Sequence, residues 1–382
     1  MLKDFLKYFS LILITTFLVL NISINLAYKD KILPNVFIAG INVGGLTTSE
    51  ALEKLKILSP KNKNITLSSQ TKEYLFNSNY FKPFVYTVAN RDKGFSPCFK
   101  VPNQLVTFEK EDKRWKLISN WTPHNSNGKY GGMLTLKQAL ANSVNTVTAY
   151  LMHEMTPEAI ITLVKDMGIQ SEIPPTPSIC LGSADISLLE MLGAYSTFAD
   201  KGLSSKPIFI TRIEDKSGNI LQEFSPEKKE VLDEQTAYVM IELMRGVISQ
   251  GTGKKLRYKY DLNTDIVGKT GTTQNQSDAW FMGLTPDLIA GVWCGCDDRF
   301  VRFRSITYGQ GAVLALPVWA KFFQKVYADK SLDIDLLKKF TPPENMNVVL
   351  DCSQYVQESN TTSNSPYGNE FDRPTSTEPA HP

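Results

Sequence analysis

Histidine and cysteine are scarce in this chain of 382 residues, which has 3 His and 5 Cys. Five cysteines are too few, and odd in number, for a disulfide framework, and so few histidines argue against a His-rich metal site. The chain also lacks a net charge of either sign, because 41 Lys and Arg against 39 Asp and Glu leave +2. Nonspecific binding of nucleic acid is therefore not expected. The content of 42% hydrophobic and 21% charged residues is typical of a globular protein and excludes collagen, a mostly disordered chain and a polytopic membrane protein.

One long apolar run lies near the N-terminus. No charged residue occurs from Tyr8 to Tyr28, which is long enough for a helix across a bilayer of roughly 30 Å. We predict a single-pass membrane anchor over residues 1–30. A cleaved signal peptide is the alternative, but the run exceeds a typical signal core and lacks a clear small-residue cleavage site. At the other end, residues 346–382 become rich in Ser, Thr, Asn and Pro, which predicts a disordered tail.

Residues 31–76 indicate a small module after the anchor. A strand, a turn at Gly44-Gly45 and a short helix are expected, with Thr47 and Glu50 in capping-box spacing. Residues 65–76 alternate as a hairpin does. The string VGGLTTSEALEKL resembles a peptidoglycan-binding-like module of cell-envelope proteins, and a generic spacer is the alternative interpretation.

Three separated motifs carry the chemistry: FKPFVYT around Lys82, NSVNT around Ser143 and Asn145, and GKTGTT over residues 268–273. Each is weak alone. Their order matches the set found in serine-acylating penicillin-binding proteins and β-lactamases. A lysine one helical turn from a serine acts as its base if burial and nearby cations keep the amine neutral. A second Ser-Asn pair relays the proton, and a Lys-Thr-Gly strand offers a cation, hydroxyls and backbone N–H groups to a peptide.

From about Phe81 to Pro342 the sequence resembles the transpeptidase domain of class A penicillin-binding proteins, which cross-link peptidoglycan. The resemblance extends beyond the motifs to WTPHNSNGKYGGMLTLKQALANSVNTVTAYLM, GVISQGTG and YGQGAVLALPVW. It implies that Lys82 is the proton acceptor and that Ser143 and Asn145 are the relay and substrate-amide pair. It implies a substrate-binding strand made of Lys269, Thr270, Gly271, Thr272 and Thr273, with an oxyanion N–H from Thr272. No cofactor or metal is expected.

The sequence departs from the family at the nucleophile. The family serine lies three residues before the lysine, where this chain has Asn79, and Ser78 is one position further away. On a regular helix the two positions differ by about 100° in direction. Pro83 cannot donate to the carbonyl of Asn79, so the turn before Lys82 must be irregular or lie at a helix start, where an extra residue can be absorbed. Ser78 is the candidate nucleophile, and a simple helix cap is its alternative role.

A second departure is length. Residues 28–79 are too few for the glycosyltransferase domain that class A members carry before the transpeptidase, so we expect no glycan polymerisation from this sequence. The strands that precede the family nucleophile are also missing. The hairpin over residues 65–76 is a candidate substitute that would pair with the transpeptidase sheet. The alternative is an internal deletion that leaves an unpaired sheet edge.

Other residues receive structural interpretations. Cys294 and Cys296 are expected on one strand and not bonded to each other, and any pairing among Cys98, Cys180 and Cys352 is left open. The Gly-Thr-Gly at 251–253 is interpreted as a helix stop. Arg302 and Arg304 alternate with apolar neighbours, which predicts a solvated strand face.

The resemblance therefore implies an α+β protein in which residues 77–345 form a transpeptidase fold, a mostly antiparallel sheet flanked by helices. The predicted function is a peptidoglycan D,D-transpeptidase that binds D-Ala-D-Ala stem peptides and β-lactams, at a bacterial plasma membrane with the main domain periplasmic or extracellular. A catalytically inactive protein that binds cell-wall peptide or a partner, and a nonfunctional remnant, are the alternatives that follow from Asn79.

Overall fold

A computed structural model describes residues 31, 37–38, 41–42, 45–47, 49–50, 53, 79–273, 276–296 and 301–353. The chain divides into two compact units, residues 1–72 and 73–382. The predicted anchor, the hairpin over 65–76, Ser78 and the tail after residue 353 lie outside the described residues. Within the described part, no helix combines the length and apolar character needed to cross a membrane.

The first unit contains the expected strand and helix start. β1 (Phe37–Ile38) pairs with β2 (Ile41–Asn42) in antiparallel fashion. The Thr47 backbone N–H donates to Glu50 Oε2 at 2.8 Å, and the Glu50 N–H donates to Thr47 Oγ1 at 3.3 Å. These reciprocal bonds confirm the predicted capping box.

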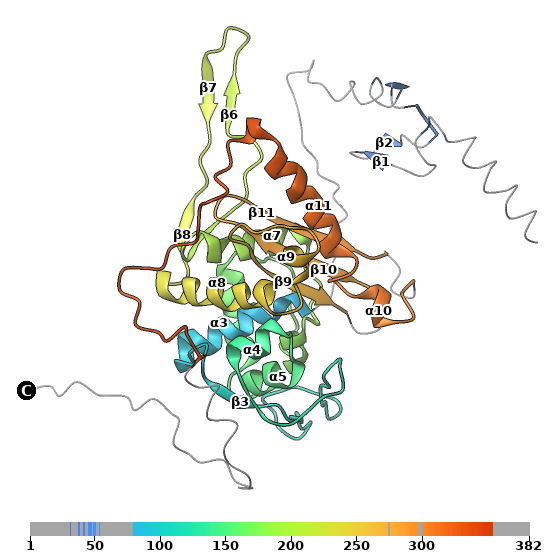
Figure 1. The fold of residues 1–382 in the computed structure, drawn as a ribbon, viewed down its shortest axis with the longest axis vertical. Helices are drawn as coiled ribbons and strands as arrows, with labels where there is room; N and C mark the ends of the chain where they lie inside the picture. The colour runs from blue at the N-terminus through green and yellow to red at the C-terminus, as the bar shows by residue number, and fades with distance from the viewer. Residues whose placement is uncertain are drawn as a thin grey trace, which may run out of the picture. The chain divides into compact units, whose positions relative to one another are not determined.

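The second unit alternates helices with short strands (Figure 1). Its elements are η1 (Asn79–Phe81), α3 (Lys82–Lys93), β3 (Lys100–Pro102), β4 (Met133–Thr135), α4 (Leu136–Ala141), α5 (Asn145–His153), α6 (Pro157–Asp166), η2 (Pro177–Leu181), α7 (Leu188–Ala199), β5 (Leu203–Ser205), β6 (Arg212–Glu214), β7 (Ile220–Glu223), β8 (Lys228–Glu230), α8 (Glu234–Ser249), α9 (Lys255–Tyr258), β9 (Val267–Thr272), β10 (Ala279–Leu284), β11 (Ile289–Cys294), α10 (Ile306–Gly309), α11 (Ala315–Ala328) and η4 (Lys330–Leu332).

The main sheet is antiparallel, in the order β11-β10-β9. Every residue of β10 is buried, because both faces of this strand are covered. On one face Phe281 packs edge-on against Trp319 of α11, and the ring of Trp319 fills the space a side chain at Gly283 would need. On the other face Trp280 packs against Tyr80 of η1, with ring centroids 4.5 Å apart. The prediction of an antiparallel sheet with helices on both sides is confirmed.

The remaining described strands form two-stranded pairs: β3 with β4, β5 with β8, and β6 with β7. The β6–β7 hairpin projects from the helices (Figure 1). The predicted strand at Arg302 and Arg304 is wrong, although both side chains are exposed. Phe303 N–H donates to Gln276 O, but no ladder follows, and Ser305 caps the start of α10 by accepting from the Thr307 N–H. An alternating pattern without a partner strand does not form a sheet.

Helix α3 lies inside the hydrophobic core, since Lys82 through Ala89 are all buried. Phe84 contacts Tyr195 edge-on and stacks on Phe198 of α7. A helix surrounded by other elements needs apolar residues on every side, which explains why its sequence shows little amphipathic pattern.

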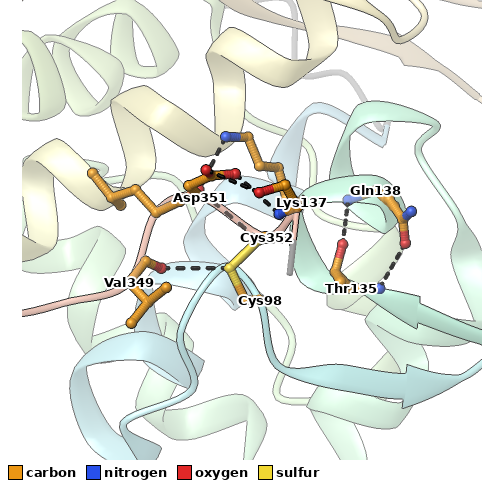
Figure 2. The surroundings of a disulfide bond; sticks show 9 residues. Cys98, Thr135, Lys137, Gln138, Val349, Asp351 and Cys352 are labelled. Atoms are coloured by element: carbon orange, nitrogen blue, oxygen red, sulfur yellow. Dashed lines mark hydrogen bonds between the residues drawn. A yellow bond between two sulfur atoms is a disulfide. The ribbon is translucent and has the colours of Figure 1, made fainter. Parts of the chain in front are cut away.

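A disulfide joins Cys98 to Cys352 across 254 residues of sequence (Figure 2). Cys180, Cys294 and Cys296 are free, so the expectation that Cys294 and Cys296 are not bonded to each other is confirmed. Cys296 lies beyond the end of β11, however, and only Cys294 is on the strand. Next to the disulfide, Lys137 Nζ donates to the Leu350 carbonyl at 3.2 Å. These contacts fix the C-terminal segment against the start of α4.

We expect Cys98→Ser to lower the free energy of unfolding by about 2–5 kcal/mol, because the disulfide closes a long loop and restricts the unfolded chain. Chemical denaturation under oxidising conditions measures the change. The matched control is Cys296→Ser, which removes a free thiol. Equal stability of the two variants would contradict a stabilising role for the disulfide.

Candidate active site

Lys82 is the first residue of α3 and is fully buried. It follows the 3-10 turn η1, and Pro83 occupies the first turn of the helix. The predicted irregular turn before Lys82 is thus confirmed. A helix start tolerates proline because the first N–H groups have no intrahelical acceptor. From this position the long Lys82 side chain reaches the junction of α4 and α5.

Ser143 forms that junction. Its φ is +56°, in the left-handed region that few side-chain-bearing residues adopt. Its N–H donates to Leu140 O, and α5 begins two residues later. Such a backbone conformation persists only where surrounding contacts hold it. The contacts here come from Lys82, whose Nζ donates to the Ser143 carbonyl at 2.7 Å and lies 3.3 Å from Ser143 Oγ.

Asn145, at the start of α5, links the same lysine to a neighbouring loop. Lys82 Nζ donates to Asn145 Oδ1 at 2.6 Å, and Asn145 Nδ2 donates to the His124 carbonyl at 2.7 Å. The carboxamide therefore uses its oxygen for the buried amine and its nitrogen for the loop.

Lys269 reaches Ser143 from the opposite side. It lies on β9 and is fully buried, with Nζ donating to Ser143 Oγ at 2.9 Å and to the Thr270 carbonyl at 2.7 Å. The structure thus brings Lys82, Ser143, Asn145 and Lys269 together from three elements and one junction. Their spacing in sequence is wide, and the common point is the Ser143 hydroxyl.

Burial shifts the pKa of both amines. Removal from water, followed by the nearby Lys269 charge, holds the pKa of Lys82 well below its usual range, and Cys180 acts weakly in the opposite direction. Burial lowers the pKa of Lys269 to about 7. Two amines with lowered pKa values on one hydroxyl are suited to accept and return a proton near neutral pH.

The Ser143 hydroxyl faces a cleft of about 690 Å³. Thr270, Thr272 and Thr273 of the predicted strand motif line it, together with Asn145. Gly271 lies between them and pairs with Trp280. A side chain at Gly311 would approach the Gly271 carbonyl to 2.4 Å, and the Gly311 N–H donates to Thr272 Oγ1 at 3.1 Å. Gly311 therefore packs directly on the strand that carries the motif.

Several cleft residues were not predicted from the sequence. Thr252, in the Gly-Thr-Gly interpreted as a helix stop, lines the cleft and hydrogen-bonds to Thr270 Oγ1 at 2.7 Å. A side chain at Gly251 would clash with the Ala141 carbonyl at 2.1 Å, so glycine allows the segment to approach α4. The presence of GVISQGTG among the resembling segments was the available signal. His124, Asn125 and Arg304 also line the cleft.

Of the two positions considered for the nucleophile, only residue 79 is among the described residues. Ser78 is not described, while Asn79 is the first residue of η1, directly before the buried Tyr80 and Phe81. In the described part of the chain no cluster of three or more His, Cys, Asp or Glu side chains is arranged to hold a metal.

The lowered pKa of Lys269 predicts a specific pH dependence of stability. Between about pH 7 and the ordinary lysine pKa of 10.5, the unfolded chain binds a proton that the folded chain does not, so stability rises with pH in this window. Lys269→Met removes that contribution. We expect the free energy of unfolding of the variant to exceed that of the parent most below pH 7. The difference between the two should shrink towards pH 10, by at most ~1.4 kcal/mol per pH unit.

Denaturant unfolding of both proteins from pH 6 to 10 measures this difference in the free energy of unfolding. Lys321→Met, at an exposed position of α11, is the control and should show no such trend. A difference between parent and Lys269→Met that does not change with pH would refute the assigned pKa shift.

Comparison with known proteins agrees with this geometry. The family model described as penicillin binding protein transpeptidase domain matches residues 55–292, more than half of the chain. Penicillin-binding protein 1A of Aquifex aeolicus is 31% identical over 281 residues, covering 72% of this chain and 36% of that protein. Penicillin-binding protein 1A of Neisseria gonorrhoeae is 32% identical over 250 residues, covering 64% and 30%. The chain thus spans about a third of the length of these curated relatives.

Solved structures show the same fold. Penicillin-binding protein 1A from Haemophilus influenzae aligns with a TM-score of 0.63 at 22% identity, over 72% of this chain and 45% of that chain. PonA1 from Mycobacterium tuberculosis aligns with a TM-score of 0.59 at 22% identity, over 72% and 74%. The matched family model spans all three motifs, and the two buried lysines converge on Ser143. This chain belongs to the penicillin-binding protein transpeptidase family, of the class A type.

Proposed function

We propose that this protein is a peptidoglycan D,D-transpeptidase that acts on D-Ala-D-Ala stem peptides through a serine acyl-enzyme and is acylated by β-lactams. The observation that carries the proposal is the hydroxyl of the cleft-lining Ser143, held 3.3 Å from Lys82 Nζ and 2.9 Å from Lys269 Nζ. This arrangement moves a proton between two amines through one hydroxyl. Acyl transfer from a peptide needs such a step twice, once in each direction.

In the proposed mechanism Ser78 is the nucleophile. Its hydroxyl attacks the carbonyl between the two D-Ala residues while Lys82, whose pKa is lowered by burial and by the Lys269 charge, accepts the proton. The peptide C–N bond breaks, and Ser143 passes a proton from the lysine side to the leaving amine of the terminal D-Ala. The amine of a second stem peptide then attacks the acyl ester, loses its proton along the same route, and restores the serine hydroxyl.

The predicted strand motif supplies binding in this proposal. β9 forms one edge of the three-stranded sheet, so an extended stem peptide would lie along it. The Thr270 and Thr272 hydroxyls, which line the cleft, would receive the peptide carboxylate, and the Thr272 N–H would stabilise the oxyanion. Thr273 lines the same cleft, although its hydroxyl already accepts a hydrogen bond from the Asp278 N–H at 2.8 Å.

The cellular setting is also proposed. The uncharged run from Tyr8 to Tyr28 would anchor the chain in the plasma membrane as a single helix, with the transpeptidase unit on the outer side. The Cys98–Cys352 disulfide supports this side, because disulfides persist in oxidising compartments.

The proposal predicts that a fluorescent penicillin labels the purified protein covalently and that the label maps to Ser78 by peptide mass spectrometry. Ser78→Ala should abolish labelling, because alanine has no hydroxyl to form the ester. Ser69→Ala, in the same upstream segment, serves as the control and should label at the parent rate.

Position 79 provides the contrary test. In the double variant Ser78→Ala with Asn79→Ser, a serine is restored three residues before Lys82. Strong labelling of this variant, with none in the parent, would show that position 79 faces the site and that the parent is not a serine acyltransferase. Label on Ser143 would likewise exclude Ser78 as the nucleophile. Reversible binding of penicillin without labelling would favour the inactive, peptide-binding alternative.

A further inference from the structure

The start of α5 has no cap of its own. Its N-cap residue, Val144, has no side-chain oxygen and makes no side-chain cap bond. The first N–H groups of a helix have no intrahelical acceptor and must be satisfied from elsewhere when they are buried. This matters because the first helical residue is Asn145, which contacts Lys82.

Asn125 supplies the missing acceptor from a distant loop. Its Oδ1 accepts from the Asn145 N–H at 2.9 Å and from the Thr146 N–H at 3.1 Å. A side-chain oxygen bonded to the first N–H groups of a helix is the usual role of an N-cap residue. Here the cap is 20 residues upstream, outside the helix sequence.

The other half of the Asn125 carboxamide is also used. Its Nδ2 donates to Asn103 Oδ1 at 2.8 Å and to the Lys129 carbonyl at 2.8 Å. Thr146 Oγ1 donates to the same Asn103 oxygen at 2.7 Å. Asn103 and Asn125 are 9% and 8% exposed and Thr146 is fully buried, so the three side chains form a satisfied polar network inside the protein.

The same loop fixes the orientation of the Asn145 side chain. His124, next to Asn125, accepts from Asn145 Nδ2 through its backbone carbonyl. A carbonyl only accepts, so the carboxamide nitrogen must face His124 and the oxygen must face Lys82. The loop therefore holds both the backbone and the side chain of Asn145.

We propose that Asn125 is a positioning residue that caps α5 from the 124–129 loop and thereby presents Asn145 Oδ1 to Lys82. The expected effect of Asn125 on acylation rests on the proposed function. Asn125→Leu keeps the approximate size and removes both acceptor and donors, which frees the helix start to shift. Since a displacement of about 1 Å near reacting groups can cost on the order of 100-fold in rate, we expect penicillin acylation to fall by about 10- to 100-fold.

Asn125→Asp separates positioning from general damage. It retains an oxygen acceptor for both N–H groups, and a negative charge suits a helix N-terminus, but it loses the two donor bonds to Asn103 Oδ1 and the Lys129 carbonyl. It should lose several times less acylation rate than Asn125→Leu. Asn120→Leu, at an exposed asparagine outside the cleft, is the control and should react as the parent does. If Asn125→Leu does not fold, Asn125→Ala replaces it as a smaller truncation.

Crystal structures of the parent and both Asn125 variants give a readout that needs no activity. We expect the Asn145 carboxamide to leave Lys82 in Asn125→Leu and to stay in Asn125→Asp. Equal acylation by Asn125→Leu and the parent, equal losses in the Leu and Asp variants, or an unmoved Asn145 would overturn the proposal. If the parent itself is not acylated, the proposed function fails, and the crystal structures still decide whether Asn125 positions Asn145.

Discussion

The structure depends on two lysine side chains that are kept out of water around one serine hydroxyl. Burying an ammonium group costs several kcal/mol unless hydrogen bonds replace its hydration. Lys82 and Lys269 donate these bonds to two backbone carbonyls, one carboxamide and the shared Ser143 hydroxyl. Among the described residues no carboxylate bonds to either amine, so the charges are compensated by dipoles. Dipoles leave the pKa values low, whereas a carboxylate partner would raise them.

This requirement explains why so much of the surrounding chain is closely packed. The acceptors for Lys82 come from a left-handed residue and from a helix start, which are both places where the backbone would otherwise relax. Glycines at 251 and 311 let two further segments approach the site at backbone contact distance, so that Thr252 and the Gly311 N–H hold the Lys269 strand in place. The unfavourable burial of two amines is therefore offset by packing in the surrounding elements.

The sequence predicts the residues around the Ser143 hydroxyl better than the residues that hold them in place. Lys82, Ser143, Asn145 and Lys269 belong to short motifs whose chemistry requires those residue types, so their convergence is predictable from order and spacing. Thr252 and Asn125 act through contacts between segments far apart in sequence. Both lie in segments that resemble the family, but a single sequence does not show which segments meet. The same reason applies to the Cys98–Cys352 pair, which sequence leaves open, and to the segment of Arg302 and Arg304, where alternation predicts a strand but no partner strand is available.

The sequence differs from the family pattern just before Lys82, and core packing limits any structural consequence to the few residues before Tyr80. Tyr80 packs on Trp280, its carbonyl accepts from the Tyr195 hydroxyl, and Phe81 is fully buried against Phe84. A shift of one residue along the chain would replace Tyr80 by Asn79 in this apolar site and leave an uncompensated carboxamide there. The register from Tyr80 onward is therefore fixed by packing. A rearrangement that brings Ser78 towards the Ser143 hydroxyl would therefore have to occur before Tyr80, and the buried pair of lysines would not have to change.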